Sequence, residues 1–269
     1  MRRPRPDLRP LVRSLWVAST DGSHVAGTRE HAIPTGEMHL VVRLVEAPVR
    51  IFAGRHDAVG RTFGHAVVAG PRDVFHVKDV CESTRAVGVQ LHPAAAVALF
   101  GVPASHLARH HLALDDLWLT ADVARLRQRL LESATPAAQL DLLETAIAAR
   151  LTCVRPLHPA VALALQAARG TDAVAAIVAA TGFSHRTVAT EFRQAMGLSP
   201  KRFLRVRRLR RLLPRIGSAP WDELALAAGF SDQAHLVREF TAITGVTPTA
   251  YLRARPEAAH HVRILQDGR

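Results

Sequence analysis

The last third of this 269-residue chain contains an internal repeat, which constrains the fold more than any other feature of the sequence. Residues 177–184 align with residues 224–231 at an offset of 47, and the triplet Gly-Phe-Ser coincides without a gap. One residue later the offset becomes 48 and then holds. The pairs that follow are Val188 with Leu236, Phe192 with Phe240, Gly197 with Gly245 and Pro200 with Pro248. Two copies of one structural unit are therefore predicted.

Each copy has the sequence expected of a helix-turn-helix. Gly182 and Gly229 end its first helix, because glycine readily adopts the left-handed conformation that reverses a chain. Ser184 and Ser231 then offer a hydroxyl that caps the second helix. That helix ends at a further glycine, and a proline follows three residues later. This plan places the second helix in a major groove of DNA.

The second helix of each copy is amphipathic, with one apolar face and one polar face. The faces predicted to pack inward are Val188, Phe192 and Ala195 in the first copy, and Leu236, Phe240 and Ile243 in the second. The faces predicted to point outward are Arg186, Thr190 and Arg193 in the first copy, and Ala234, Arg238 and Thr241 in the second, with His235 alongside. The offset of 48 relates the outward positions, so the two helices should present equivalent surfaces.

An arginine-rich helix over residues 201–213 is predicted to connect the copies. Its inward stripe is Phe203, Val206, Leu209 and Leu213. At 1.5 Å per residue it is about 20 Å long, and with its flanking helices it can hold two reading helices near the ~34 Å spacing of successive major grooves. The residues on it predicted to contact phosphates are Lys201, Arg202, Arg205 and Arg208. A solvated face is the alternative interpretation of these side chains.

Positive charge is concentrated in the same region. Residues 155–255 hold 15 of the 35 basic residues but only six of the 23 acidic ones, in a chain whose net charge is +12. A basic block inside a helical region indicates a polyanionic partner, with nucleic acid the first candidate. The alternative is a general preference for arginine, since only Lys78 and Lys201 are lysines.

These motifs resemble the AraC/XylS family of transcription regulators. The resemblance covers residues 158–255 and rests on the runs 182–188, 192–193, 197–203, 229–240 and 245–248. By motif position it implies base contacts from Arg186, Ala189, Thr190, Gln233, Ala234, His235 and Arg238. Thr190 departs from the family pattern, which often has arginine there, and so does Val178, where a small residue is common. The change at Thr190 weakens direct reading of bases by the first copy.

The chemistry of these side chains fits base recognition. Arg186 and Arg238 can each fork onto a guanine edge, and Gln233 can pair with adenine. Contact with phosphate alone is the alternative for one of the two arginines.

The N-terminal part has a different pattern, typical of strands. Short apolar or alternating runs occupy residues 11–18, 39–44, 49–53, 65–69, 74–77 and 86–91, with turn-forming residues between them. Residues 94–100, 121–133 and 137–151 have helical periodicity. The predicted fold class is α+β. Residues 1–154 form a barrel- or sandwich-like domain with strands in 11–92 and helices in 93–154, residues 155–255 form an all-α DNA-binding domain, and residues 256–269 form a flexible tail.

No catalytic, cofactor or metal site is predicted, and the protein is not expected to be an enzyme. The 15 histidines lack the His-x-His run, followed by glutamate, of a cupin metal site. Cys81 and Cys153 stand in unrelated contexts, which argues against a disulfide framework or a zinc site. No phosphate loop, dinucleotide fingerprint or Gly-x-Ser-x-Gly elbow is present.

The expected function is that of a bacterial, sequence-specific transcription regulator acting on double-stranded DNA. The resemblance implies three further partners, namely a small-molecule effector of unknown identity, a second copy of the chain and RNA polymerase. A nucleic-acid binder without sequence preference, or an adaptor, is the alternative. A cytoplasmic location is expected, because the longest nearly apolar run, residues 93–103, is about half of what a membrane helix needs.

Overall fold

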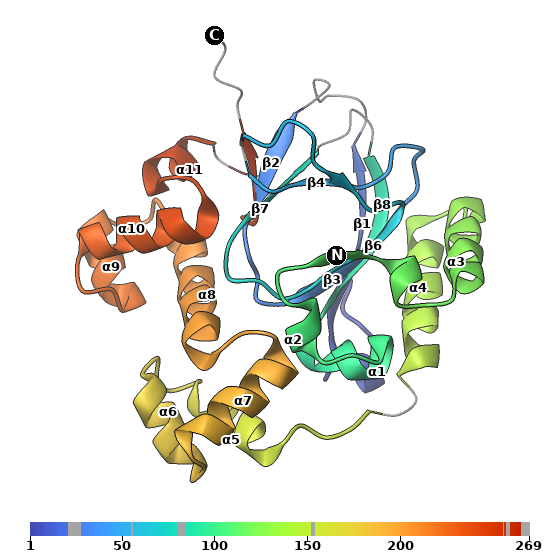
Figure 1. The fold of residues 1–269 in the computed structure, drawn as a ribbon. Helices are drawn as coiled ribbons and strands as arrows, with labels where there is room; N and C mark the ends of the chain where they lie inside the picture. The colour runs from blue at the N-terminus through green and yellow to red at the C-terminus, as the bar shows by residue number, and fades with distance from the viewer. Residues whose placement is uncertain are drawn as a thin grey trace.

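The computed structural model describes residues 1–20, 28–54, 56–79, 84–151, 154–254, 256 and 259–264. Within these ranges two five-stranded antiparallel sheets make up most of the N-terminal domain (Figure 1). Sheet A has the strand order β1-β8-β3-β6-β9, with bounds Val12–Thr20, Thr84–Leu91, Met38–Arg43, Ala66–Ala69 and His111–Ala113. Sheet B has the order β10-β2-β7-β4-β5, with bounds His261–Ile264, Arg29–Ala32, His76–Asp79, Arg50–Phe52 and Arg61–Thr62. The predicted α+β class is confirmed.

The main hydrophobic core lies between sheet A and the helices behind it. Leu15, Leu40 and Val89 on the outer face of the sheet are each 0% exposed. They belong to one core cluster with Leu143 and Ile147 of α4. Burial of apolar side chains at roughly 1.5–3 kcal/mol each makes this face the main source of stability in the domain.

Helices make up most of the other regular structure in the described chain. Four belong to the N-terminal domain: α1 (Ala96–Phe100), α2 (Ala104–Leu107), α3 (Thr120–Glu132) and α4 (Pro136–Arg150). The first C-terminal unit contains α5 (Pro159–Ala167), α6 (Val174–Thr181) and α7 (His185–Met196), and the second contains α9 (Trp221–Ala228), α10 (Gln233–Thr244) and α11 (Pro248–Ala254). Between them runs α8 (Pro200–Leu212), the connecting helix that the sequence predicted (Figure 1).

Several strands were not predicted. The strands β2, β5, β9 and β10 are two to four residues long, too short to show periodicity. The segment expected to be purely helical, residues 93–154, therefore also contributes β9, which pairs with β6 and forms one edge of sheet A.

The expectation of a flexible tail after residue 255 is wrong for its described part. Residues 261–264 pair with β2 and extend sheet B. Val262 of β10 is 2% exposed and joins the core of the second helical unit, as does Ile33 beside β2. The free edge of β2 and these apolar contacts order the strand, and neither is visible in the sequence of the tail.

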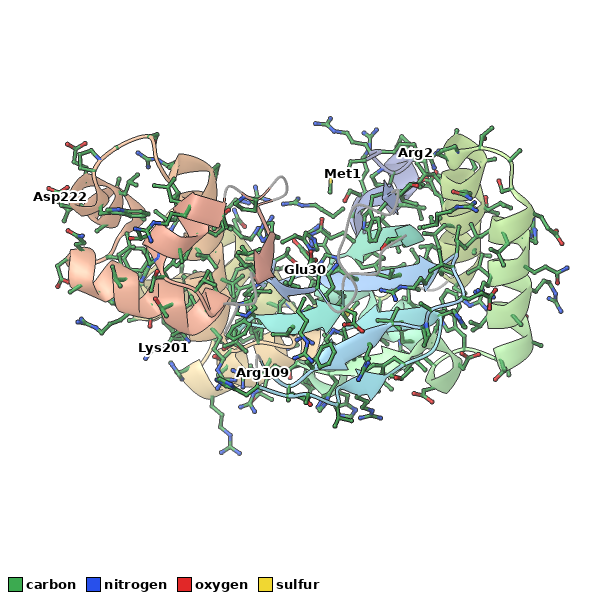
Figure 2. All side chains as sticks on the ribbon, turned by 90° about the horizontal axis from the view of Figure 1, so that it is seen from above. Met1, Arg2, Glu30, Arg109, Lys201 and Asp222 are labelled. Atoms are coloured by element: carbon green, nitrogen blue, oxygen red, sulfur yellow. The ribbon has the colours of Figure 1, made fainter. Side chains whose placement is uncertain are left out.

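The two parts of the molecule lie against each other. Seen from above in Figure 2, the helical domain and the N-terminal domain form adjoining lobes, and Glu30 lies where they meet. Arg210 of α8 donates to the carbonyl oxygen of Thr35 at 3.1 Å and to Glu37 at 3.4 Å. Val206 packs on Gly36, where a Cβ would lie 3.3 Å from Val206 Cγ1. The connecting helix is thus also a contact surface for the N-terminal domain.

Candidate nucleic-acid interface

The first recognition helix, α7, forms as the repeat predicts. Gly182 reverses the chain before it with φ +70°, a conformation that favours glycine. The Ser184 hydroxyl then accepts a hydrogen bond from the backbone N–H of Thr187 at 3.1 Å and caps the helix. Val188 and Phe192 are 0% and 2% exposed, which confirms the inward face. Ala195 is only partly buried.

The second recognition helix, α10, is capped by a different residue from the one predicted. Asp232, not Ser231, is the capping residue, and its carboxylate accepts from the backbone N–H of His235 at 2.6 Å. This bond lowers the pKa of Asp232, and a hydrogen bond from the Ser231 hydroxyl adds to the effect. The change of offset from 47 to 48 explains the difference, because it aligns Ser184 with Asp232.

The faces expected to read DNA lie at the surface. The exposed residues among them are Arg186, Thr190, Arg193, Gln233, Ala234 and Arg238, and the partly buried ones are Ala189, His235 and Thr241. The inward residues opposite them in the second unit, Leu236, Phe240 and Ile243, are 0–2% exposed, as predicted. Both recognition helices therefore bury one side and offer the other to solvent.

His235 has a structural contact that limits its reading role. Its ring packs edge-on against Phe230 at 5.4 Å between centroids. Its Nδ1 lies 3.3 Å from the backbone nitrogen of Ser231, which donates to it. Only the Nε2 side of the ring is left for a base, so this residue supports the turn as well as facing the groove.

The arginines of the recognition helices differ from those of α8. Across the described residues, Arg186, Arg193 and Arg238 form no ion pair and no hydrogen bond. Side chains with five donors and no internal partner are suited to a ligand rich in acceptors, such as a base edge or a phosphate. The arginines on the predicted reading surface are therefore not engaged by a carboxylate in the way that those of α8 are.

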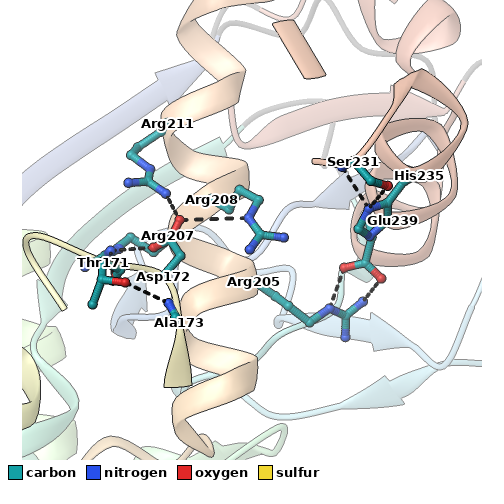
Figure 3. A network of polar contacts seen from close by, with 10 residues as sticks. All are labelled: Thr171, Asp172, Ala173, Arg205, Arg207, Arg208, Arg211, Ser231, His235 and Glu239. Atoms are coloured by element: carbon teal, nitrogen blue, oxygen red, sulfur yellow. Dashed lines mark hydrogen bonds and ion pairs between the residues drawn. The ribbon is translucent and has the colours of Figure 1, made fainter. Parts of the chain in front are cut away.

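Asp172, in the turn before α6, is the centre of a network on one side of α8 (Figure 3). Its carboxylate accepts from Arg207 at 2.5 Å and from Arg211, and lies 3.9 Å from Arg208. Burial raises the pKa of Asp172, but the hydrogen bonds from Arg207 and Arg211 outweigh it and hold the pKa below its usual value. The first helical unit is thereby tied to the connecting helix.

A second ion pair ties α8 to the other unit. Arg205 donates from Nε and Nη2 to the carboxylate of Glu239 in α10, at 2.7 and 3.2 Å (Figure 3). This planar two-bond geometry is the most directional form of an ion pair. The connecting helix is therefore tied to both helix-turn-helix units, through Asp172 before α6 and through Glu239 of α10.

These contacts change the expected phosphate roles. Arg205 and Arg208 are used inside the domain, and the Arg208 guanidinium also lies over the Phe230 ring, 5.2 Å from its centroid. Arg202 is exposed but lies 3.5 Å from Asp73 of the N-terminal domain. Lys201 is exposed and has no such contact in the described chain. Of the four residues, Lys201 best keeps the role of a phosphate contact as a prediction.

The inward stripe of α8 is also broader than predicted. Val206, Leu209 and Leu213 are buried and Phe203 is partly buried, but Leu204 and Leu212 are buried as well. Both units and the N-terminal domain pack around this helix, which leaves it little free surface. Asp172 and Glu239 could not be singled out from the sequence, because their partners lie 35 and 34 residues away.

Replacing Asp172 with alanine is expected to loosen the first unit against α8. Two partly buried guanidinium groups, those of Arg207 and Arg208, and the exposed one of Arg211 lose their shared acceptor, which should lower the free energy of unfolding by about 1–3 kcal/mol. Affinity for a duplex that carries both half-sites should fall more than affinity for one that carries a single half-site, since orientation matters only when both units bind. Chemical denaturation and fluorescence anisotropy measure the two effects.

Asp222→Ala is the matched control, because Asp222 is an exposed aspartate at the start of α9 (Figure 2). It should leave both quantities nearly unchanged. Equal losses on duplexes with one and two half-sites would show that Asp172 does not set the relative orientation of the units.

Other kinds of site find no support in the described residues. No group of three or more histidine, cysteine, aspartate or glutamate side chains in them is arranged to hold a metal ion. Cys81 and Cys153 lie outside the described residues. None of the described helices has both the length and the apolar character that crossing a membrane requires.

Comparison with known proteins agrees with this geometry. Residues 162–254 match a family model described as a helix-turn-helix domain, and residues 1–113 match a domain of unknown function, DUF6597. No curated protein sequence matches the chain.

The solved structures similar to this one include ToxT from Vibrio cholerae. The apo form of a ToxT point variant is 11% identical and covers 94% of this chain and 99% of its own, with a TM-score of 0.49. A wild-type form bound to an unsaturated fatty acid is 12% identical and covers 94% of this chain and 97% of its own, with a TM-score of 0.48. These values are too low to transfer any residue role. The repeat, the two capped recognition helices and the family match together show that the C-terminal region of this chain is an AraC-type helix-turn-helix domain.

Proposed function

We propose that this protein is a sequence-specific transcription regulator whose helices α7 and α10 enter two successive major grooves of one DNA duplex. The observation that carries the proposal is the contrast between the arginines of the domain. Those on the outward faces of the two recognition helices form no ion pair or hydrogen bond in the described chain, whereas Arg205, Arg207 and Arg208 of α8 are held by Glu239 and Asp172.

The same contrast weighs against a binder without sequence preference. Such a protein would use the arginine-rich helix as a broad phosphate-binding surface. Because most of the guanidinium groups on α8 are engaged by carboxylates, that surface is largely used up inside the protein. The N-terminal domain is then the candidate regulatory module, and an effector, a second copy of the chain and RNA polymerase remain predictions from the resemblance.

Arg238→Ala is expected to relax sequence preference. The preferred duplex is first selected from a random library with the wild-type protein. Loss of a bidentate contact to a base should weaken binding to that duplex by about 5–150-fold, equivalent to about 1–3 kcal/mol. Affinity for random duplex should change much less. Competition assays at fixed salt concentration measure both.

Lys201→Ala is the matched control for a phosphate contact. It should weaken binding to selected and random duplexes alike. The slope of log affinity against log salt concentration should become shallower by about one. If Arg238→Ala also lowers both affinities equally, Arg238 does not read bases. If the wild-type protein shows no preferred sequence, the proposed function is wrong.

A further inference from the structure

The C-terminal ends of both recognition helices rest on one short segment of the N-terminal domain, residues 71–75. At the end of α7, Gly197 lies so close to Pro71 that an added Cβ would be 2.3 Å from the proline Cγ. In the last turn of α10, the carbonyl oxygen of Ile243 accepts from the backbone N–H of Phe75 at 2.8 Å. Five consecutive residues are therefore in contact with both reading helices.

The same segment also meets the connecting helix. The carboxylate of Asp73 lies 3.5 Å from Nε of Arg202 in the first turn of α8. Beside it, the Phe75 ring stacks on the ring of His31 at 4.3 Å between centroids, and Nδ1 of His31 lies 3.0 Å from the carbonyl oxygen of Thr244. A displacement of this segment would therefore be felt by α7, α8 and α10 together.

Arg109 braces segment 71–75. Its backbone N–H donates to the carbonyl oxygen of Pro71 at 2.9 Å. Its side chain donates from Nε and Nη2 to the two carboxylate oxygens of Asp73, at 2.7 and 2.9 Å. Arg109 has φ +63°, and among the described residues no other non-glycine residue has a positive φ. Backbone strain of this kind persists only where the surroundings fix a residue firmly.

Arg109 is itself anchored to the core of sheet A. Leu107, two residues earlier, is 2% exposed and belongs to the main hydrophobic core. The carbonyl oxygen of His110 accepts from the backbone N–H of Gly70 at 3.0 Å, and β9 then pairs with β6. Figure 2 shows Arg109 on the side of the N-terminal domain that adjoins the helical domain. A continuous set of contacts thus runs from the core through Arg109 to the ends of α7 and α10.

The electrostatics of the pair keep both partners charged. Burial raises the pKa of Asp73, but the hydrogen bond from Arg109 and the charges of Arg109 and Arg202 outweigh it and hold this pKa below its usual value. The same hydrogen bond raises the pKa of Arg109. The carboxylate is 1% exposed, and two parallel bonds to one guanidinium are the most directional form of an ion pair. The direction of the Asp73 side chain is therefore set by Arg109.

We propose that Arg109 is a positioning residue of the DNA interface: by holding Asp73 it fixes segment 71–75, and this segment sets the distance and angle at which α7 and α10 are presented to one duplex. The proposal rests on the proposed function and adds to it. The N-terminal domain, and not the connecting helix alone, then determines which separation of the two half-sites the protein accepts.

The spacing test uses the full-length protein and the duplex selected by the wild type. One or two base pairs are inserted or removed between the half-sites, which moves the second groove by about 3.4 Å and turns it by about 35° per base pair. Two linked units lose the gain from joint binding when geometry prevents both from engaging. The wild-type protein is therefore expected to bind the altered duplexes at least about tenfold more weakly.

Arg109→Gln removes the ion pair and should make this loss at least about threefold smaller, because the two units can then adjust to the altered spacing. Its affinity for a duplex with a single half-site should stay within about twofold of the wild type. Asp73→Asn breaks the same pair from the other side, and the double variant should show no further change. Arg129→Gln removes the same charge from an exposed position on α3 and is the control, with the spacing dependence of the wild type.

A merely stabilising ion pair would give a different pattern. Arg109→Gln would then lower the free energy of unfolding but leave the spacing dependence unchanged, and that result overturns the proposal. Equal weakening on duplexes with one and two half-sites would also overturn it, since it would make Arg109 a direct DNA contact. If Asp73→Asn does not fold, Arg109→Lys, which keeps the charge but cannot form both bonds, should show an intermediate spacing dependence.

Hydrogen exchange without DNA tests the brace by itself. The Phe75 amide, which donates to Ile243, should exchange at least about tenfold faster in Arg109→Gln than in the wild type or Arg129→Gln. Unchanged exchange would show that Arg109 does not hold the segment against α10. Faster exchange with an unchanged spacing dependence would overturn the positioning role while the proposed function stands. A wild-type protein that selects no duplex would instead overturn the proposed function, whatever the exchange shows.

Discussion

Replacing Gly245 with alanine should lower the free energy of unfolding by about 2–5 kcal/mol and loosen α10 from the N-terminal domain. Gly245 ends α10 with φ +76°, where a side chain is strained by about 1–2 kcal/mol. A Cβ there would also lie 2.5 Å from Phe75 and 2.7 Å from His31, so two stacked rings would have to move. Overpacking of this kind adds about 1–3 kcal/mol. Chemical denaturation measures the loss.

The repeat supplies the control for this variant. Gly182 has a nearly identical φ of +70°, but an added Cβ would meet nothing within 4 Å. Gly182→Ala should therefore show the backbone strain alone, about 1–2 kcal/mol. Hydrogen exchange at the Phe75 amide, which donates to Ile243 across the interface, should accelerate only in Gly245→Ala. If both variants lose the same free energy of unfolding and the Phe75 amide exchanges as in the wild type, the interface accommodates the added methyl group without strain.

The fold of the C-terminal region could be predicted because its determinants are local. A glycine at positive φ, a capping side chain and an apolar stripe act within a few residues, so Gly182, Ser184 and Phe192 carry their structural roles in the sequence itself. The one-residue insertion in the second copy also had a local consequence, the transfer of the cap to Asp232. This consequence was missed because two capping residues stand side by side.

The parts that could not be predicted depend on partners far away in the chain. Whether Arg205 meets a phosphate or a carboxylate depends on Glu239, 34 residues later, and an arginine-rich helix has the same sequence in either case. The histidines of the N-terminal domain are scattered in sequence, yet the strand register puts His39 and His111 on either side of Ala69. Register of this kind is set by long-range pairing.

Removing residues 259–269 should lower the free energy of unfolding by about 2–4 kcal/mol and expose an edge of sheet B. The deletion removes Val262, which is 2% exposed in the core of the second helical unit, and the carbonyl oxygen of His260 that accepts from Ile33 at 2.8 Å. Tyr251 also loses Ala259 as the acceptor of its hydroxyl. Denaturation of the full-length and shortened proteins measures the change.

The deletion should also alter association, because β2 becomes an unpaired edge strand and such edges recruit other strands. Gel filtration is expected to show that the shortened protein forms larger oligomers as its concentration rises. The protein without the deletion should keep its native oligomeric state at the same concentrations. A shorter deletion, of residues 265–269, keeps β10 and is the control. Since β10 joins β2 of one domain to the core of the other, its loss should also weaken any effect of the N-terminal domain on DNA binding. Identical stability and association in the two deletions would show that β10 does not hold the domains together.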